Sequence, residues 1–267
     1  ESSLLWSLSR HLEEFDVLVT YNGKVYDQPL LETRYRMARS RDPFGRMDHL
    51  DLLYGARRLW RLQFQSCRLV DLEYQILGFE RQGDVPGEMI PYLYFEFVRR
   101  REAFRLVPVF HHNAIDILTL ACLTAIVPWA FRSPEDAPLT RGPEVLGLSR
   151  WFLQTGDVER GLALMRRAVD IGLPDDLLFR ALWDIAMQEK KRDCRAEAVT
   201  LLTDLAISPN PYRIRAMEEL AKHYEHHERD YATALEMTLE AIGLEPCEAL
   251  ERRATRLRGR LTRPQSR

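Results

Sequence analysis

The chain has 267 residues, of which 46% are hydrophobic and 29% charged, and its formal net charge is −2. At roughly 150 residues per domain, this length predicts about two domains. The nearly balanced charge excludes a chain that is basic throughout. Neither the charge nor the ordinary globular composition points by itself to a nucleic-acid or membrane partner.

Four widely separated cysteines, Cys67, Cys122, Cys194 and Cys247, include no Cys-x-x-Cys pair. This spacing argues against a zinc site and favours unpaired, buried thiols in the reducing cytosol, so we expect a cytoplasmic protein. We find neither an apolar run of transmembrane length nor a signal peptide, and therefore expect no membrane partner. The first residue is not Met and opens a helical pattern, which we interpret as a piece of a longer protein.

The first 39 residues predict a helix, a strand, a turn and a second helix. Residues 2–15 carry apolar side chains on one helical face, and the apolar run 16–20 predicts a buried strand. An Asn-Gly turn follows, and residues 28–39 have a helical pattern. Such a junction brings side chains to the carboxyl edge of a sheet, where open α/β folds place their chemistry. Asp27 lies at this junction.

The following segments predict one more strand and several helices. Residues 47–54 alternate as a strand does, and 67–77 predict a short helix that Gly78 ends. The charge pattern around residues 92–98 favours a helix over a strand. Residues 112–131 are nearly all apolar after Asp116, and a helix that is apolar on all sides is expected to be buried.

A loose belt of arginines accompanies these elements. It suits a phosphate backbone, and it equally suits a solvated surface interleaved with aspartates, so both interpretations stay open. The belt consists of Arg34, Arg36, Arg39, Arg41, Arg46, Arg57, Arg58, Arg61 and Arg68.

Prolines mark a linker at 132–145, after which only amphipathic helices are predicted. Small residues and a terminal proline recur there with a period of about 34 residues, which is the tetratricopeptide signature. We therefore expect tetratricopeptide-like helical repeats at 146–250, which offer a surface to a protein partner. The basic segment 251–267 is either a frayed terminal helix or a nucleic-acid-binding tail. For His223, His226 and His227 the alternatives are a metal site and ordinary packing.

Two aspartates are candidates for catalysis. Asp27 also suits a helix N-cap, because Asp-Gln-Pro begins a helix well. Asp116 and His112 are four residues apart, so both project from one helix face. A buried carboxylate needs a cation or several hydrogen-bond donors, which leaves a metal ion and an arginine as alternative partners of Asp116.

This set of residue types is suited to phosphodiester hydrolysis. Carboxylate oxygens are preferred ligands of Mg²⁺ and Mn²⁺, and two such ions about 4 Å apart clamp the attacking and leaving oxygens. His112, or the neighbouring His111, is placed to take the proton from the attacking water. Asp51, at the end of the second strand, is a nearby acidic residue for which we favour a structural role.

Several stretches, in this order, resemble the YprB-type ribonuclease H-like domains of the DEDD superfamily of 3′–5′ exonucleases. The second half is similar to the C-terminal part of such proteins, so the resemblance covers nearly the whole chain. The matching stretches are residues 20–31, 49–53, 84–91, 112–118 and 221–230.

The resemblance implies a role for each matching residue. Asp27 and Asp116 would be ligands of Mg²⁺ or Mn²⁺, and His112 would be the general base. The substrate would be nucleic acid, DNA or RNA. Its contacts would come from Tyr21, Asn22, Lys24 and Asn113.

The family's first motif, an Asp-x-Glu on the central strand, has no counterpart in this chain. The expected fold is therefore α/β plus all-α, with a truncated ribonuclease H-like domain at 1–131 and helical repeats after the linker. Losing two of four carboxylates should remove most divalent-ion affinity, so we expect this chain to be inactive unless an upstream segment completes the site. The expected function is a metal-dependent 3′–5′ exonuclease, and the alternative is a non-catalytic nucleic-acid-binding and protein-interaction module.

Overall fold

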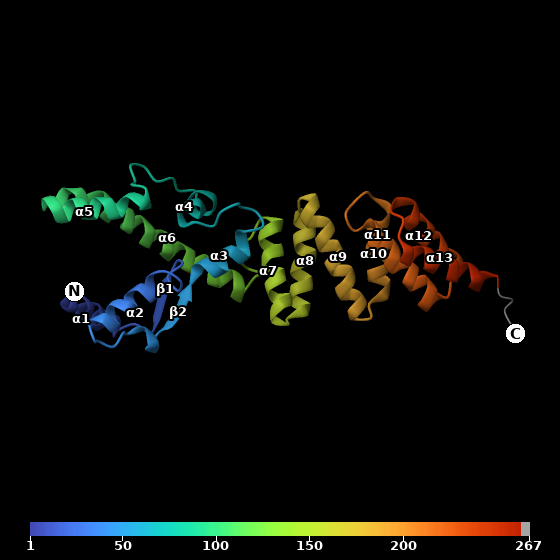
Figure 1. The fold of residues 1–267 in the computed structure, drawn as a ribbon, viewed down its shortest axis with the longest axis horizontal. Helices are drawn as coiled ribbons and strands as arrows, with labels where there is room; N and C mark the ends of the chain where they lie inside the picture. Colours follow the sequence, from blue (N-terminus) through green and yellow to red (C-terminus); the bar gives the residue numbers. More distant parts are fainter. Residues whose placement is uncertain (263–267) are drawn as a thin grey trace. The chain divides into compact units, whose positions relative to one another are not determined.

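A computed structural model describes residues 1–262 and divides the chain into two compact units, Glu1–Leu139 and Thr140 onward. Arg263 and Arg267 of the basic segment lie outside the described residues. The elements of the first unit are α1 (Ser2–Leu12), β1 (Val17–Thr20), α2 (Asp27–Met37), β2 (Asp48–Asp51), α3 (Leu52–Trp60), α4 (Leu69–Leu72), α5 (Ile90–Arg100) and α6 (Val107–Arg132). Figure 1 shows them in blue to green.

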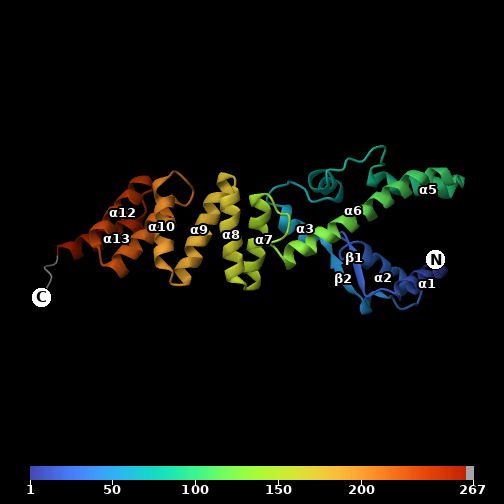
Figure 2. The same cartoon turned by 180° about the vertical axis from the view of Figure 1, so that it is seen from behind.

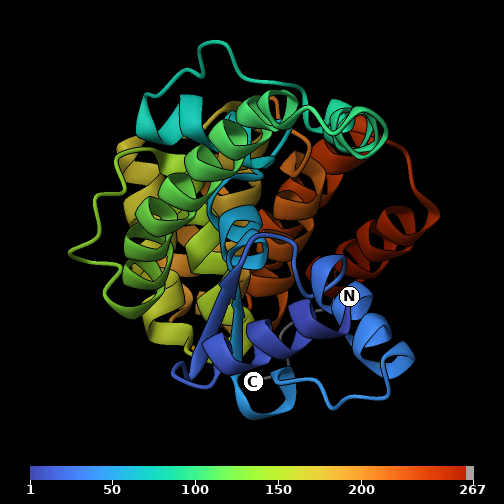
Figure 3. The same ribbon diagram turned by 90° about the vertical axis from the view of Figure 1, so that its left-hand side faces the viewer.

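The two strands pair in parallel, with Val17 opposite Asp48 and Thr20 opposite Asp51. Parallel strands need a crossover, and α2 supplies it between them. The second strand is shorter than the predicted 47–54, because Asp51 accepts a hydrogen bond from the Leu53 backbone N–H (3.1 Å) and thereby caps α3. Figure 3 shows both strands beside α1 and α2.

An apolar cluster of Leu5, Tyr35 and Phe44 joins α1 to α2 and the segment before β2. The Tyr35 hydroxyl donates to the Leu5 carbonyl (2.8 Å) and accepts from the Ser9 hydroxyl (2.9 Å). The buried hydroxyl group of Tyr35 therefore has hydrogen-bond partners both as donor and as acceptor. The predicted helices at 2–15, 28–39, 67–77 and 92–98 are all present, the third as α4 followed by the π-helical turn Glu73–Leu77.

The long helix α6 packs against α3 and β1 on one face. Ile115, Thr119, Leu123 and Val127 form its buried stripe, whereas Leu118 on another face is 67% exposed. The expectation that this helix is buried on all sides is therefore wrong. By length and composition it could also cross a membrane, a criterion that core helices of soluble proteins meet as well, so the expectation of no apolar run of such length is wrong too.

The second unit is helical throughout its described part. Its helices are α7 (Gly142–Thr155), α8 (Val158–Ile171), α9 (Asp175–Lys191), α10 (Arg195–Ile207), α11 (Arg213–His223), α12 (Tyr231–Leu244) and α13 (Glu248–Leu261). Each packs against its neighbour in sequence, and Figure 2 shows them following one another in order. Residues 251–261 belong to α13, whose Leu250, Ala254 and Leu257 are buried, so a frayed end is wrong for this part.

Two buried carboxylates link helices of the second unit to arginines. Glu189 of α9 binds Arg166 of α8 (2.6 Å), and Glu225 binds both Arg253 (2.9 Å) and Arg256 (2.9 Å) of α13. Both carboxylate side chains are almost inaccessible to solvent. Such pairs are costly to break, because removing one partner leaves an uncompensated buried charge.

Cysteines and histidines also bear on the sequence expectations. All four cysteines are free, but Cys122 and Cys247 are exposed and the other two only partly buried, so the expectation of buried thiols is wrong. The rings of His223 and His227 lie 5.7 Å apart. Among residues 1–262 no group of three or more His, Cys, Asp or Glu side chains is arranged to hold a metal ion, and the packing interpretation of the three histidines stays a prediction.

Candidate active site

The turn that follows β1 is held by the buried carboxylate of Asp51. One oxygen accepts from the Asn22 backbone N–H (2.8 Å) and the other from the Lys24 backbone N–H (3.0 Å). Asn22 has a positive φ of 68°, a conformation that asparagine tolerates better than most residues. The structural role expected for Asp51 is confirmed, since this side chain fixes the turn to the end of β2.

Asp27 is the first residue of α2, and Tyr26 occupies the N-cap position without a side-chain cap bond. The N-cap interpretation of Asp27 is therefore wrong, and its exposed carboxylate is free of that role. The pKa of Asp27 is above its usual value, chiefly because burial raises it. A backbone hydrogen bond acts to lower this pKa, and the negative charge of Asp51 acts to raise it. Asp27 and Asp51 thus lie close enough to influence one another.

His49 fastens the start of α2 to the sheet. Its Nε2 lies 2.7 Å from the Thr20 hydroxyl of β1, and its Nδ1 lies 2.6 Å from the Gln28 side-chain oxygen. The pKa of His49 is below its usual value, because burial and the positive charge of Lys24 lower it. The negative charge of Asp51 acts to raise this pKa but does not outweigh them. The neutral imidazole therefore positions the helix that carries Asp27.

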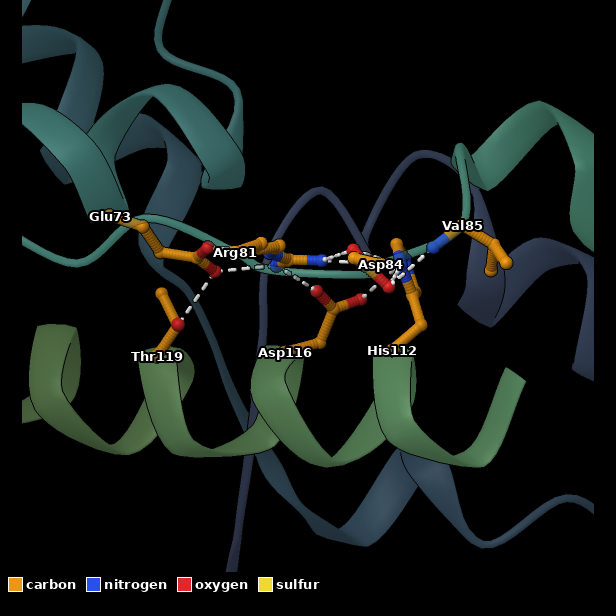
Figure 4. Close-up of polar contacts among 7 residues, drawn as sticks. All are labelled: Glu73, Arg81, Asp84, Val85, His112, Asp116 and Thr119. Carbon is orange, nitrogen blue, oxygen red and sulfur yellow. Dashed lines mark hydrogen bonds and ion pairs between the residues drawn. The ribbon is translucent and has the colours of Figure 1, made fainter. Parts of the chain in front are cut away.

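Asp116 lies on α6 in a network centred on Arg81, whose side chain is only 5% exposed (Figure 4). Arg81 Nη2 contacts Asp116 Oδ1 at 2.5 Å and Glu73 Oε1 at 2.5 Å, and Arg81 Nη1 contacts Asp84 Oδ2 at 2.9 Å. The fully buried Glu73 also accepts from the Thr119 hydroxyl (2.6 Å). Of the two alternatives for Asp116, the structure shows the arginine partner. The chief reason that the pKa of Arg81 is raised is its hydrogen bond to Glu73.

His112 lies one turn before Asp116 on the same face of α6, as the spacing predicts (Figure 4). Its Nδ1 is 2.8 Å from Asp84 Oδ2, and its Nε2 is 3.4 Å from Asp116 Oδ2. Burial acts to raise the pKa of Asp84, but the hydrogen bonds from Arg81 and His112 outweigh it and lower the pKa below its usual value. His111 and Asn113 are exposed.

The structure joins some of the expected site residues and leaves others apart. His112 and Asp116 share one network, whereas no hydrogen bond or ion pair joins Asp27 to either of them among residues 1–262. Tyr21 and Asn22 line a cavity, and the Lys24 side chain is exposed. With Asp116 already neutralised by Arg81, and no group of three His, Cys, Asp or Glu ligands among the described residues, the side chains as they stand do not fit a bound metal ion.

Sequence reasoning missed the partners of Asp116 and His112, namely Glu73, Arg81 and Asp84. Arg81 and Asp84 follow Gly78 in a segment without helix or strand, where the sequence shows only turn signals. Two signals were available: the matching stretch 84–91 begins at Asp84, and the Arg-x-x-Asp spacing places opposite charges three residues apart. Nothing in the sequence shows that this pair folds back onto α6.

The first unit resembles known proteins in sequence. Residues 1–127 match the family model of the RNase_H superfamily. The chain is also 33% identical over 256 residues to the uncharacterized protein YprB of Bacillus subtilis, a match that includes 94% of this chain and 61% of YprB. The chain thus spans about three fifths of this relative's length. No solved structure matches the chain.

Proposed function

From a domain of the RNase H superfamily at residues 1–127, which contains both Asp27 and Asp116, we propose that this protein acts as a nuclease. The observation that carries the proposal is the family match, because it covers the unit in which the candidate carboxylates lie. RNase H-like nucleases commonly use divalent metals. The finer proposal is a DEDD-type 3′–5′ exonuclease that cleaves DNA or RNA with Mg²⁺ or Mn²⁺.

In this proposal Asp27 and Asp116 would hold a metal ion, which would supply charge stabilisation to the reacting phosphate. Because the described residues do not fit an ion as they stand, the site needs further carboxylates, and Asp116 has to exchange its contact with Arg81. We assign no step to the metal on this geometry. Lys24 and Asn113, both exposed, are proposed to contact the nucleic acid.

His112 is the proposed general base, and Asp84 orients it. Nδ1 lies nearer to the Asp84 carboxylate (2.8 Å) than to the Arg81 guanidinium (3.2 Å). Because a carboxylate accepts and a guanidinium only donates, this geometry favours a proton on Nδ1. In this proposal Nε2, which lies 3.4 Å from Asp116 Oδ2, accepts a proton from water once Asp116 has exchanged its present contacts. A base oriented by a second carboxylate is a recurrent arrangement in hydrolytic sites.

The alternative is a non-catalytic module that binds nucleic acid and a protein partner. The neutralisation of Asp116 by Arg81 favours it, because a carboxylate already paired with arginine does not need a metal. In either case we propose that α7–α13 act as tetratricopeptide-like repeats and offer a surface to a protein partner. This proposal is supported by the sequential packing of the helices in the second unit.

The deciding measurement is Mn²⁺-dependent degradation of a labelled single strand by the full-length gene product and by the 267-residue chain, side by side. We expect Asp116→Asn to lower the cleavage rate at least about 100-fold in whichever protein is active. The substitution removes a carboxylate that is both a proposed metal ligand and the neighbour of His112, the proposed general base. Asp204→Asn, at an exposed position of α10, is the matched control. Activity confined to the full-length product would show that a further segment completes the site.

Two outcomes would contradict these assignments. If Asp116→Asn retains wild-type activity while circular dichroism shows a folded protein, the assignment of the site is wrong. If neither protein cleaves but both bind single strands with an affinity that falls with salt, the binding module replaces the nuclease.

A further inference from the structure

A second site lies in the first unit, in a cavity of about 570 Å³ next to the carboxyl end of β1. Its lining includes Tyr21 and Asn22 after β1, Arg57 of α3 and Arg61 at the C-cap of that helix, and Ser66 and Arg68 of the following segment. The Tyr21 hydroxyl donates to the carbonyl of Cys67, which ties the turn after β1 to that segment. We call this cavity the arginine pocket.

The arginine pocket contains more positive charge than its neighbours neutralise. Among the described residues neither Arg57 nor Arg61 forms an ion pair. Arg68 forms an ion pair with Asp71 (3.1 Å), and the Arg68 side chain is 82% exposed. Arg57 of α3 and Arg61 at the C-cap of this helix, where the backbone is still helical, are four residues apart and therefore share one face, on which like charges repel. A bound anion would remove this repulsion.

The two arginine charges also converge on the cavity. Both act to lower the pKa of the Cys67 thiol, although burial outweighs them and raises it, and Arg57 acts on Tyr21 in the same sense. Arg57 and Arg61 line the pocket together with Tyr21 and Cys67. Planar guanidinium groups bind phosphate oxygens in a bidentate manner, and the Asn22 amide adds a neutral hydrogen-bonding group.

We propose that the arginine pocket binds a non-scissile phosphate of the nucleic-acid strand. This inference rests on the proposed function, because the strand is the source of the phosphate. The pocket begins at Tyr21 and Asn22, in the same short connection between β1 and α2 that ends at Asp27. A phosphate held by Arg57 and Arg61 therefore fixes the nucleic-acid strand beside the connection that ends at Asp27. This phosphate takes no part in cleavage.

The test measures binding of the whole chain to a fluorescein-labelled single-stranded oligonucleotide by fluorescence anisotropy, in EDTA so that no cleavage occurs. We expect Arg57→Gln/Arg61→Gln to weaken binding at least about tenfold and to reduce the slope of log affinity against log salt by about 0.7, the value for one phosphate of a single strand. Arg132→Gln, at an exposed position near the end of α6, is the control and should bind as wild type does. Circular dichroism on heating checks that the variants fold.

A second arm locates the phosphate. Replacing single phosphates of the oligonucleotide by neutral methylphosphonates should weaken wild-type binding most at one position, and the double variant should lose nothing further there. Wild-type affinity in the double variant overturns the inference and leaves the nuclease proposal standing. Absence of any oligonucleotide binding by the wild type overturns both. Displacement of the oligonucleotide by an equal concentration of inorganic phosphate or a mononucleotide assigns the pocket to a free ligand instead, and also overturns the inference.

Discussion

At the scale of single residues, Arg81 is the side chain on which the candidate site depends most. It binds Glu73, Asp84 and Asp116, and its partner Glu73 is fully buried. We expect Arg81→Gln to lower the free energy of unfolding by about 3–5 kcal/mol, because a buried charge is left without its partner. Urea unfolding followed by circular dichroism measures this loss.

The control for Arg81 is an ion pair of the same chemistry on the surface. Arg252 contacts Glu248 at 3.3 Å, with both side chains more than two-thirds exposed (71% and 79%). Arg252→Gln should cost less than about 1 kcal/mol, because solvent screens such pairs. Equal losses in the two variants would contradict the view that the Arg81 network stabilises the first unit.

The sequence indicated some residues of the site and not others for a physical reason. Asp116 and His112 could be paired in advance, because helical periodicity alone places residues i and i+4 on one face. Arg81 is 35 residues from Asp116 along the chain, and the contact depends on how an irregular segment folds back onto α6. No local pattern specifies such a contact, so the alternatives of metal ion and arginine could not be decided beforehand.

At the scale of elements, glycines permit close approach of backbones in the second unit. A Cβ built on Gly142, at the start of α7, would lie 2.0 Å from the Gly172 carbonyl oxygen and 2.8 Å from that of Ala168. Because both obstacles are backbone atoms, they cannot move aside as a flexible side chain could. We expect Gly142→Ala to lower the free energy of unfolding by about 1–3 kcal/mol through overpacking.

Gly259 in α13 gives the opposite expectation from the same substitution. Apart from its chain neighbours and the backbone of its own helix, no atom lies within 4 Å of a Cβ built there. Gly259→Ala should therefore stabilise the protein by about 0.4–1 kcal/mol, since alanine restricts the unfolded chain more than glycine does. Thermal unfolding of both variants tests the pair, and a stabilised Gly142→Ala variant would refute the close approach of α7 to α8.

The positions of most helices and both strands could be predicted at this scale, because each depends on local periodicity and on turn residues such as Gly78. The burial of α6 could not. Its composition shows an apolar surface all round, but burial depends on which elements are present to cover it. In the described chain α3 and β1 cover one face and leave Phe110, Ile117 and Leu118 exposed.

At the scale of the whole molecule, both units depend on carboxylates that are ionised in the folded state. The pKa values of Asp84 in the first unit and of Glu189 and Glu225 in the second are all below their usual range. In each case burial acts to raise the pKa, and hydrogen bonds from arginines outweigh it. Asp84 receives such a bond from Arg81, Glu189 from Arg166 and Glu225 from Arg256.

These lowered pKa values predict that the protein loses stability in acid. A carboxylate whose pKa is lower in the folded state stabilises the fold above its unfolded pKa of about 4, and this contribution disappears as the pH falls through the folded pKa. We therefore expect the free energy of unfolding to change little on account of these groups from pH 7 to pH 5, and to fall steeply below about pH 4. Urea unfolding at pH 7, 5, 4 and 3 measures it.

A substitution at Glu225 separates this effect from general charge repulsion at low pH. Glu225→Gln should be less stable than wild type at pH 7, because Arg253 and Arg256 lose a buried partner. Its stability should then fall less between pH 5 and pH 3, since the group that binds a proton on unfolding is gone. Glu248→Gln, at an exposed side chain of α13, should keep the wild-type slope. If Glu225→Gln keeps it as well, the acid sensitivity of the second unit does not come from this buried carboxylate.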